Sequence, residues 1–196
     1  MLHITAPAWR GRSLRLALPV AALLGAAGAG ACLGAPAAAA EEFAPQLRPW
    51  TRGPAPALAL DRLGGGRTDL AGARGSVVLV HFFATWCEPC RAEMASLRRL
   101  AADPPVPGLA ILAVDVGEVD ARVARFFEAE PLPFPILMDR DRAATRAWGI
   151  VALPSTVVLD ADLIPRLIVE ADLDWDSPDV RRTLATLAGP VPARAD

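Results

Sequence analysis

The sequence predicts an α/β fold in which a mixed central sheet carries helices on both faces and follows an N-terminal β-hairpin. Residues 77–83 and 109–114 are short apolar runs typical of buried strands. Segments with helical spacing of apolar residues alternate with these runs, and such alternation implies parallel strands joined by helices. Residues 156–160 and 166–169 are close enough to form an antiparallel pair at the edge of the sheet.

Each expected element depends on a local pattern. Three consecutive glycines, residues 64–66, favour a hairpin turn. Met94, Leu97 and Leu100 recur at helical spacing, and Ser177 followed by proline is typical of a helix N-cap. The predicted elements, in chain order, are strands 58–60 and 68–70, strand 77–83, helix 89–100, strand 109–114, helix 118–129, strand 136–138, helix 141–148, strands 156–160 and 166–169, and a helix from residue 177 to residue 187.

The chain is expected to have three parts. Residues 1–40 resemble a secretory signal, with three arginines, then a stretch rich in Ala, Leu and Gly, then small residues. The apolar stretch also reaches the ~18 residues that can span a bilayer, so an uncleaved N-terminal anchor is the alternative. Residues 41–56 are expected to form a Pro-rich arm, and residues 57–190 the α/β domain. We therefore expect a periplasmic or other extracytoplasmic protein, either free or tethered to the inner membrane.

Charge and cysteine usage narrow the classes of function. The formal charge is −2 and becomes −5 without residues 1–40, which argues against nucleic acid or an anionic membrane surface as a partner. Beyond residue 40 the only cysteines are Cys87 and Cys90. A loop this short restrains the unfolded chain very little, so the pair is not a structural crosslink. No metal is expected, and no cofactor other than the cysteine pair itself.

The most informative motif is Cys87-Glu88-Pro89-Cys90. Two cysteines separated by two residues suit either half of a zinc site or a redox pair. The motif stands between the apolar run 77–83 and a predicted helix, and a helix N-terminus stabilises a thiolate through its partial positive charge and free N–H groups. A thiolate attacks disulfides, whereas a thiol does not. The position therefore favours redox chemistry over zinc binding.

These features resemble the thioredoxin superfamily and, within it, the exported TlpA/ResA-type thiol–disulfide oxidoreductases. The resemblance covers residues 57–188 and implies a thioredoxin-like fold. It joins the cysteine motif to a later Leu-Pro-Ser-Thr stretch, in which the family has a cis-proline. The matching stretches are residues 77–93, 113–118, 148–150, 153–156 and 174–178.

The resemblance implies roles for the residues nearest the reaction. Cys87, exposed at the start of the helix, would be the attacking nucleophile, and Cys90 the buried thiol that resolves the mixed disulfide. Trp86, Leu153 and Pro154 would bind the substrate. A cis bond at Pro154 would present the Leu153 backbone for strand-like hydrogen bonds.

Glu88, Pro89 and Glu93 are expected to tune the site. The charge of Glu88 would oppose thiolate formation, or would only complement the helix N-terminus, while Pro89 restricts the turn. Glu93, one helical turn after Cys90, would relay a proton for that thiol, or would lie on a solvated helix face. The sequence leaves each pair of alternatives open.

Glu118 also matches a position of the family, whereas His81 departs from the family pattern. Thioredoxins carry a buried Asp where this chain has His81, and a histidine there would accept the Cys90 proton near neutral pH, or would be a hydrogen-bonded core residue. For Glu118 we expect only a charge at a helix N-terminus.

The resemblance implies an exported enzyme that reduces partner-protein disulfides through a mixed disulfide on Cys87. The partner would be an apocytochrome c or a copper-site assembly protein, and a membrane electron donor would re-reduce the enzyme, which would act as a monomer. A thiol oxidant or isomerase of the same fold is one alternative, distinguished by a reduction potential of about −120 to −180 mV. A copper-binding chaperone is another, distinguished by tight and stoichiometric Cu(I) binding.

Overall fold

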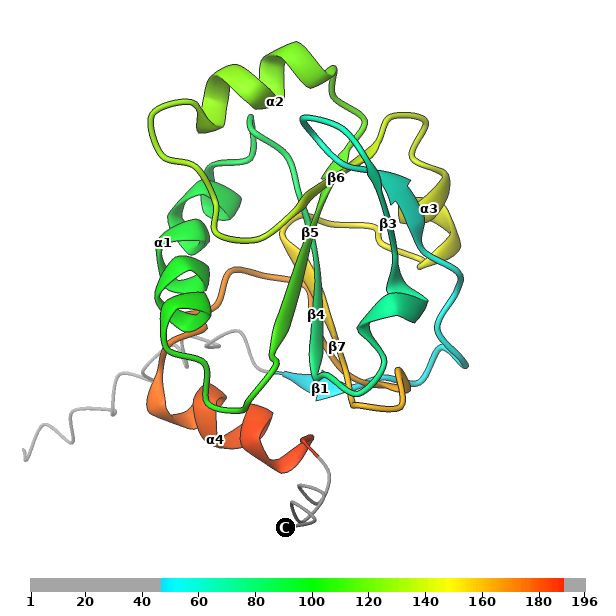
Figure 1. Ribbon diagram of the computed structural model, residues 1–196. Coiled ribbons are helices and arrows are strands. Elements are labelled where there is room, and N and C mark those ends of the chain that lie inside the picture. Colours follow the sequence, from blue (N-terminus) through cyan, green and yellow to red (C-terminus); the bar gives the residue numbers. More distant parts are fainter. Residues whose placement is uncertain (1–46, 189–196) are drawn as a thin grey trace, which may run out of the picture. The chain divides into compact units, whose positions relative to one another are not determined.

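The computed structural model describes residues 47–188, in which the main feature is a six-stranded mixed sheet (Figure 1). Its strands, in spatial order, are β1 (Arg48–Pro49), β8 (Pro165–Val169), β7 (Ser155–Leu159), β4 (Val78–Phe83), β5 (Ala110–Val116) and β6 (Ile136–Asp139). Strands β4, β5 and β6 run parallel, and β7, β8 and β1 are added by antiparallel pairing. The predicted mixed sheet is therefore confirmed.

Helices cover both faces of this sheet, as the sequence predicted. Helices α1, α2 and α4 pack on one face, where their buried residues form one apolar cluster. Helix α3, the hairpin and a 3₁₀ helix pack on the other face. The bounds are α1 (Glu88–Ala102), α2 (Asp120–Phe127), α3 (Ala143–Ala147), α4 (Pro178–Thr186), η1 (Leu70–Ala73), and hairpin strands β2 (Ala59–Asp61) and β3 (Arg67–Asp69).

Strand β4 lies between these two clusters and is buried along its whole length. Because side chains alternate along a strand, Leu79 and Phe83 contribute to the cluster under α1, whereas Val80 and Phe82 contribute to the opposite cluster. His81 shares the face of Leu79 and Phe83, and its ring stacks on Phe83 with centroids 6.0 Å apart. The strand therefore points one polar side chain into the core on the side of α1.

Two helices begin later than the sequence indicated, and a residue with positive φ precedes each of them. Helix α2 begins at Asp120 rather than residue 118, after Gly117 at φ 80°. Helix α3 begins at Ala143 rather than residue 141, because Arg142 adopts the left-handed conformation at φ 60°. Hydrophobic periodicity does not reveal such interruptions, since it reports only which face is buried.

Part of the predicted Pro-rich arm packs against the sheet. Its described part, residues 47–56, belongs with the domain, since β1 pairs with β8 and the rings of Trp50 and Trp148 lie 6.3 Å apart. An extended segment beside an open sheet edge satisfies its backbone groups by pairing with that edge. The predicted signal peptide or anchor, residues 1–40, lies outside the described residues. None of the helices within 47–188 is long and apolar enough to cross a membrane.

Asp139, at the end of β6, is fully buried and holds the start of α3. Its carboxylate accepts hydrogen bonds from the Ala144 N–H at 3.1 Å, the Thr145 N–H at 2.7 Å and the Thr145 hydroxyl at 2.6 Å. A helix of five residues is not stable by itself, so α3 depends on such a cap.

Substitution Asp139→Ala should therefore lower the free energy of unfolding by about 2–4 kcal/mol, because it leaves two buried N–H groups without a partner. Urea denaturation followed by circular dichroism would measure the change. The matched control is Asp162→Ala, since the Asp162 side chain is 80% exposed and should change stability by less than about 0.5 kcal/mol. Equal stability of the two variants would contradict the capping role of Asp139.

Candidate active site

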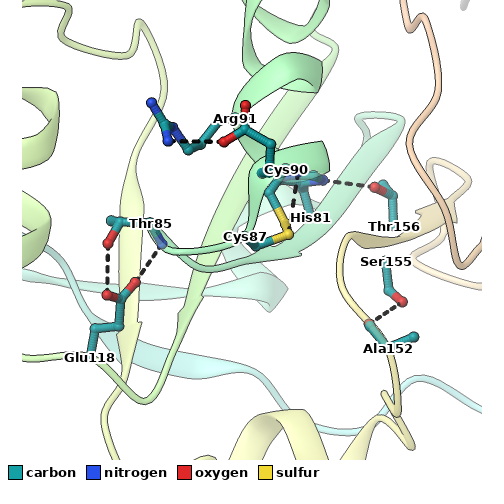
Figure 2. Close-up of a disulfide and its surroundings, with 10 residues drawn as sticks. His81, Thr85, Cys87, Cys90, Arg91, Glu118, Ala152, Ser155 and Thr156 are labelled. Atoms are coloured by element: carbon teal, nitrogen blue, oxygen red, sulfur yellow. Dashed lines mark hydrogen bonds and ion pairs between the residues drawn. A yellow bond between two sulfur atoms is a disulfide. The ribbon is translucent and has the colours of Figure 1, made fainter. Parts of the chain in front are cut away.

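The two cysteines form a disulfide at the N-terminus of α1 (Figure 2). Cys87 is the N-cap residue, and its sulfur accepts a hydrogen bond of 3.3 Å from the Cys90 N–H. Cys90 is fully buried. Cys87 was expected to be exposed, yet it keeps only 5% of its surface in this oxidised state. The reason is that the bond to Cys90 holds its sulfur against the first turn of α1.

Glu88 and Pro89 occupy the first turn of α1, between the cysteines. The Glu88 side chain is 81% exposed, and it forms an ion pair with Arg91 at 3.0 Å. Solvent and the Arg91 guanidinium both screen the charge of Glu88, so its effect on the neighbouring thiolate is weak. This environment favours the simpler of the two interpretations of Glu88, an acidic residue that complements the helix N-terminus.

The segment around Pro154 lies among the surroundings of the disulfide (Figure 2). The Leu153–Pro154 peptide bond is cis, as predicted. The Ser155 hydroxyl donates a hydrogen bond of 2.7 Å to the carbonyl of Ala152, which closes the turn around the proline. Trp86, next to Cys87, leaves 60% of its surface exposed. The structure thus presents a large aromatic side chain beside the disulfide.

His81 is fully buried and forms one hydrogen bond, between Nδ1 and the Thr156 hydroxyl at 2.9 Å. Within residues 47–188 its Nε2 atom has no partner. Burial lowers the pKa of His81 to about 3, because the interior cannot solvate an imidazolium. His81 is therefore neutral near pH 7, which favours the interpretation as a hydrogen-bonded core residue over that of a proton acceptor.

Glu93 is buried, so the solvated helix face considered for it is wrong. One oxygen accepts a hydrogen bond from the indole N–H of Trp175, itself fully buried, and the other oxygen has no partner within residues 47–188. Burial raises the pKa of Glu93 to about 8, the Trp175 bond opposes this shift, and the charge of Asp172 adds to it. Near neutral pH this carboxyl therefore holds a proton that it can release under mildly basic conditions.

Glu118 makes contacts that the sequence did not reveal. It lies before α2 rather than in it, and its carboxylate accepts the Thr85 N–H at 2.5 Å and the Thr85 hydroxyl at 2.7 Å. Its own N–H donates to Asp115 at 3.0 Å, and Arg122 pairs with it at 2.9 Å. The expected charge at a helix N-terminus is thus replaced by a clamp on the segment that leads into the cysteine motif.

Of the two carboxyl groups in this network, Asp115 and Glu118, it is Glu118 that carries the negative charge. Burial raises the pKa of Asp115 to about 8. For Glu118 the desolvation is outweighed by the hydrogen bonds from Thr85, so its pKa is lowered. The one sequence signal for this arrangement is that Thr85 and Glu118 follow adjacent apolar strands, whose carboxyl ends meet at one edge of a parallel sheet.

A Cys-x-x-Cys disulfide at a strand-to-helix junction, on a mixed sheet with helices on both faces, is the arrangement of thioredoxin-like thiol–disulfide oxidoreductases. Known proteins agree with this class. The chain belongs to the AhpC/TSA family, whose sequence pattern matches residues 51–166. The resemblance to ResA-type oxidoreductases is also confirmed, because proteins of that name are 33–39% identical to this chain over the aligned residues.

Two relatives and one solved structure show how similar this chain is to known proteins. The thiol–disulfide oxidoreductase ResA of Geobacillus thermodenitrificans is 39% identical over 106 residues, covering 54% of this chain and 61% of the relative. ResA of Geobacillus kaustophilus is 33% identical over 133 residues, covering 68% and 75%. A thiol:disulfide interchange protein of the thioredoxin family from Chlorobium tepidum has the same fold, with a TM-score of 0.59 at 24% identity over 74% of this chain and 99% of its own.

The raised pKa of Glu93 predicts how stability depends on pH. The folded state holds the Glu93 proton up to about pH 8, whereas the unfolded state holds it only up to about pH 4.5. The contribution of this proton to the free energy of unfolding is therefore fully present below pH 4.5 and is lost as the pH rises through 8. Glu93→Gln stays neutral and keeps an acceptor for Trp175. At pH 9 we expect the variant to be more stable than the wild type by up to about 4 kcal/mol, with equal stability near pH 4.

The measurement is urea denaturation of the oxidised protein between pH 4 and 9. Asp115 contributes a decline of the same sign to both proteins, so the difference between the two curves isolates Glu93. The control Glu128→Gln, at an exposed residue, should follow the wild type. Parallel curves for Glu93→Gln and wild type would contradict a raised pKa at this position.

Proposed function

We propose that this protein is an extracytoplasmic thiol–disulfide oxidoreductase that reduces a disulfide of a partner protein. The observation that carries the proposal is the Cys87–Cys90 disulfide at the N-terminus of α1, next to an exposed Trp86 and the turn around Pro154. The relatives named as ResA thiol–disulfide oxidoreductases support the chemistry, although their name does not state its direction.

The proposed reaction is a two-step exchange that starts from the reduced pair. The Cys87 thiolate attacks one sulfur of the partner disulfide and releases the other sulfur as a thiolate, leaving a mixed disulfide. Cys90 then loses its proton and attacks the Cys87 sulfur, which releases the second partner sulfur. Two electrons pass to the partner, and the enzyme returns to the disulfide seen in the structure. Cys87 suits the first step because it caps α1, whose N-terminus favours a thiolate.

Cys90 is fully buried, so its proton needs an acceptor within the protein. Glu93 in its deprotonated form, whose share grows as the pH approaches 8, is the candidate for this role. It lies one turn after Cys90, has one carboxylate oxygen without a partner within residues 47–188, and has a pKa raised by burial to about 8, close to that of a thiol. His81 is a poorer acceptor, because its pKa is lowered to about 3 by burial.

The surroundings of the pair support the reductive direction. A strong oxidant needs its thiolate stabilised by a nearby cation, since that favours the reduced form. Here neither His81 nor Glu93 carries a positive charge, and as Glu93 loses its proton near pH 8 it adds a buried negative charge one turn from Cys90. Both features leave the reduced pair without electrostatic stabilisation beyond the helix N-terminus, so the pair gives up electrons readily.

The partners in this proposal follow the family resemblance. The reduced protein would be an apocytochrome c or a copper-site assembly protein, and a membrane protein would return electrons to the Cys87–Cys90 pair. The proposed site of action, outside the cytoplasm, is supported by the signal-like composition of residues 1–40. The enzyme would act as a monomer.

A variant that cannot resolve the mixed disulfide tests the proposed reaction. Cys90→Ser, expressed with the full chain in its native compartment, should accumulate a covalent complex through Cys87, because the second attacking sulfur is missing. Non-reducing electrophoresis and mass spectrometry would identify the trapped partner. Cys87→Ser is the matched control and should trap nothing. Trapping by Cys87→Ser alone would reverse the assignment of the nucleophile.

The reduction potential tests the direction of electron flow. Equilibration of the purified protein with glutathione or dithiothreitol buffers should give a potential more negative than about −200 mV, in the range of reductants such as thioredoxin and glutaredoxin. A value between about −120 and −180 mV would instead support the oxidant or isomerase alternative. Tight, stoichiometric Cu(I) binding by the same reduced protein would favour the copper-chaperone alternative.

A further inference from the structure

A groove of about 490 Å³ opens beside the disulfide, between the cysteine motif and α3. Trp86, adjacent to Cys87, and Leu153, adjacent to Pro154, both line it, so the groove begins at residues that directly neighbour the cysteine motif and the cis-proline. Val116 and Ile150 are buried within it, whereas Val151 is 86% exposed. Apolar side chains beside a reactive site, left open to solvent, indicate a surface that binds another molecule.

Two arginines, Arg142 and Arg146, complete the wall of this groove on the side of α3. Both are exposed, and within residues 47–188 neither forms an ion pair with a carboxylate. In the same range twelve of the sixteen arginines do form such pairs. The charges in the groove are therefore uncompensated, on a protein that is acidic as a whole.

The two acidic residues that precede α3 are already engaged in holding that helix. Asp139 is buried and accepts the N–H groups of Ala144 and Thr145, and the Asp141 carboxylate accepts the Ala143 N–H at 3.0 Å. Among the described residues that line the groove there is no Asp or Glu. A ligand in the groove thus meets apolar surface and two positive charges.

The backbone holds Arg142 in this position. Its left-handed conformation, φ 60° and ψ 23°, is uncommon for a residue with a side chain, and such outliers are concentrated at functional sites. The Arg142 side chain lies against Gly117, where a methyl group would overlap it. Arg146 is oriented separately, by a hydrogen bond of 2.9 Å from its guanidinium to the Asp141 carbonyl. Arg142 is thus placed by its backbone and by its packing against Gly117, and Arg146 by its hydrogen bond.

We infer that this groove binds an acidic segment of the partner protein, and that Arg142 and Arg146 contact its carboxylates while the reactive disulfide meets Cys87. The inference rests on the proposed function, since it names the kind of partner that the redox site selects. Apolar side chains of the segment would contact Trp86 and Val151. Guanidinium groups suit this task because they bind carboxylates in a bidentate manner and stay charged at all relevant pH values.

The experiment uses two synthetic peptides, each with one intramolecular disulfide. They are identical except that three glutamates flanking the first cysteine in one peptide are glutamines in the other. The reduced protein donates two electrons to either peptide, and its own pair becomes the Cys87–Cys90 disulfide. The ratio of the two second-order rates is the readout, because a ratio within one variant cancels any change in thiol reactivity or folded fraction.

For the wild type at low salt we expect the Glu peptide to react about fivefold faster than the Gln peptide, and the ratio should fall towards one at 0.5 M salt. The double variant Arg142→Gln and Arg146→Gln should show a ratio near one at low salt. The control Arg125→Gln should keep the wild-type ratio, because Arg125 is an exposed arginine that does not line the groove.

The outcomes separate this inference from the proposed function. Equal rates in the wild type, or an unchanged ratio in the double variant, would overturn the acidic-segment inference and leave the reductase function in place. Failure of the wild type to reduce either peptide would contradict the proposed function, and the inference with it. The mixed disulfide is the same in both directions, so oxidised protein with reduced peptides should give the same ranking.

Discussion

The buried central strand β4 is the constraint on which the rest of the structure depends. Every residue from Val78 to Phe83 is buried, with the two faces of the strand packed into different apolar clusters. The strand pairs with β5 on one side and β7 on the other, and its carboxyl end leads into the cysteine motif. A strand held on four sides cannot shift register, because a slip of one residue would exchange its two faces. The start of α1, and Cys87 with it, is thereby fixed.

Around the carboxyl end of β4 the protein buries polar groups, and most of these groups are neutral near pH 7. His81 and Glu93 both have pKa values moved by burial toward the uncharged form, to about 3 and about 8. Glu118 is the exception, since its pKa is lowered by hydrogen bonds from Thr85. The charge it carries holds the backbone before the motif and pairs with Arg122. The disulfide therefore lies in a region where protons are retained near pH 7, which suits a pair whose thiols must exchange protons during the reaction.

The surface beside the disulfide differs from this interior in both polarity and charge. Trp86 and Val151 are exposed, and Arg142 and Arg146 extend the apolar surface with positive charge. We assign different roles to the buried groups and to the exposed groups. In the reaction that we propose, the buried groups would set the reactivity of the sulfur atoms, and the exposed ones would select the partner disulfide.

Local pattern in the sequence was sufficient for the fold class, the order of elements and the cysteine pair, because period, length and motif spacing are properties of neighbouring positions. The cis bond at Pro154 was expected from the family resemblance. Burial of Glu93 and the clamp of Glu118 on Thr85 depend on residues 82 and 33 positions away, and no local pattern encodes such pairs. Pairing of the arm with β8 and the left-handed Arg142 were hidden for the same reason. The sequence by itself thus pointed to the two cysteines that we propose as the reacting pair. Only the tertiary structure decided their environment, because desolvation and hydrogen bonding arise when distant segments come together.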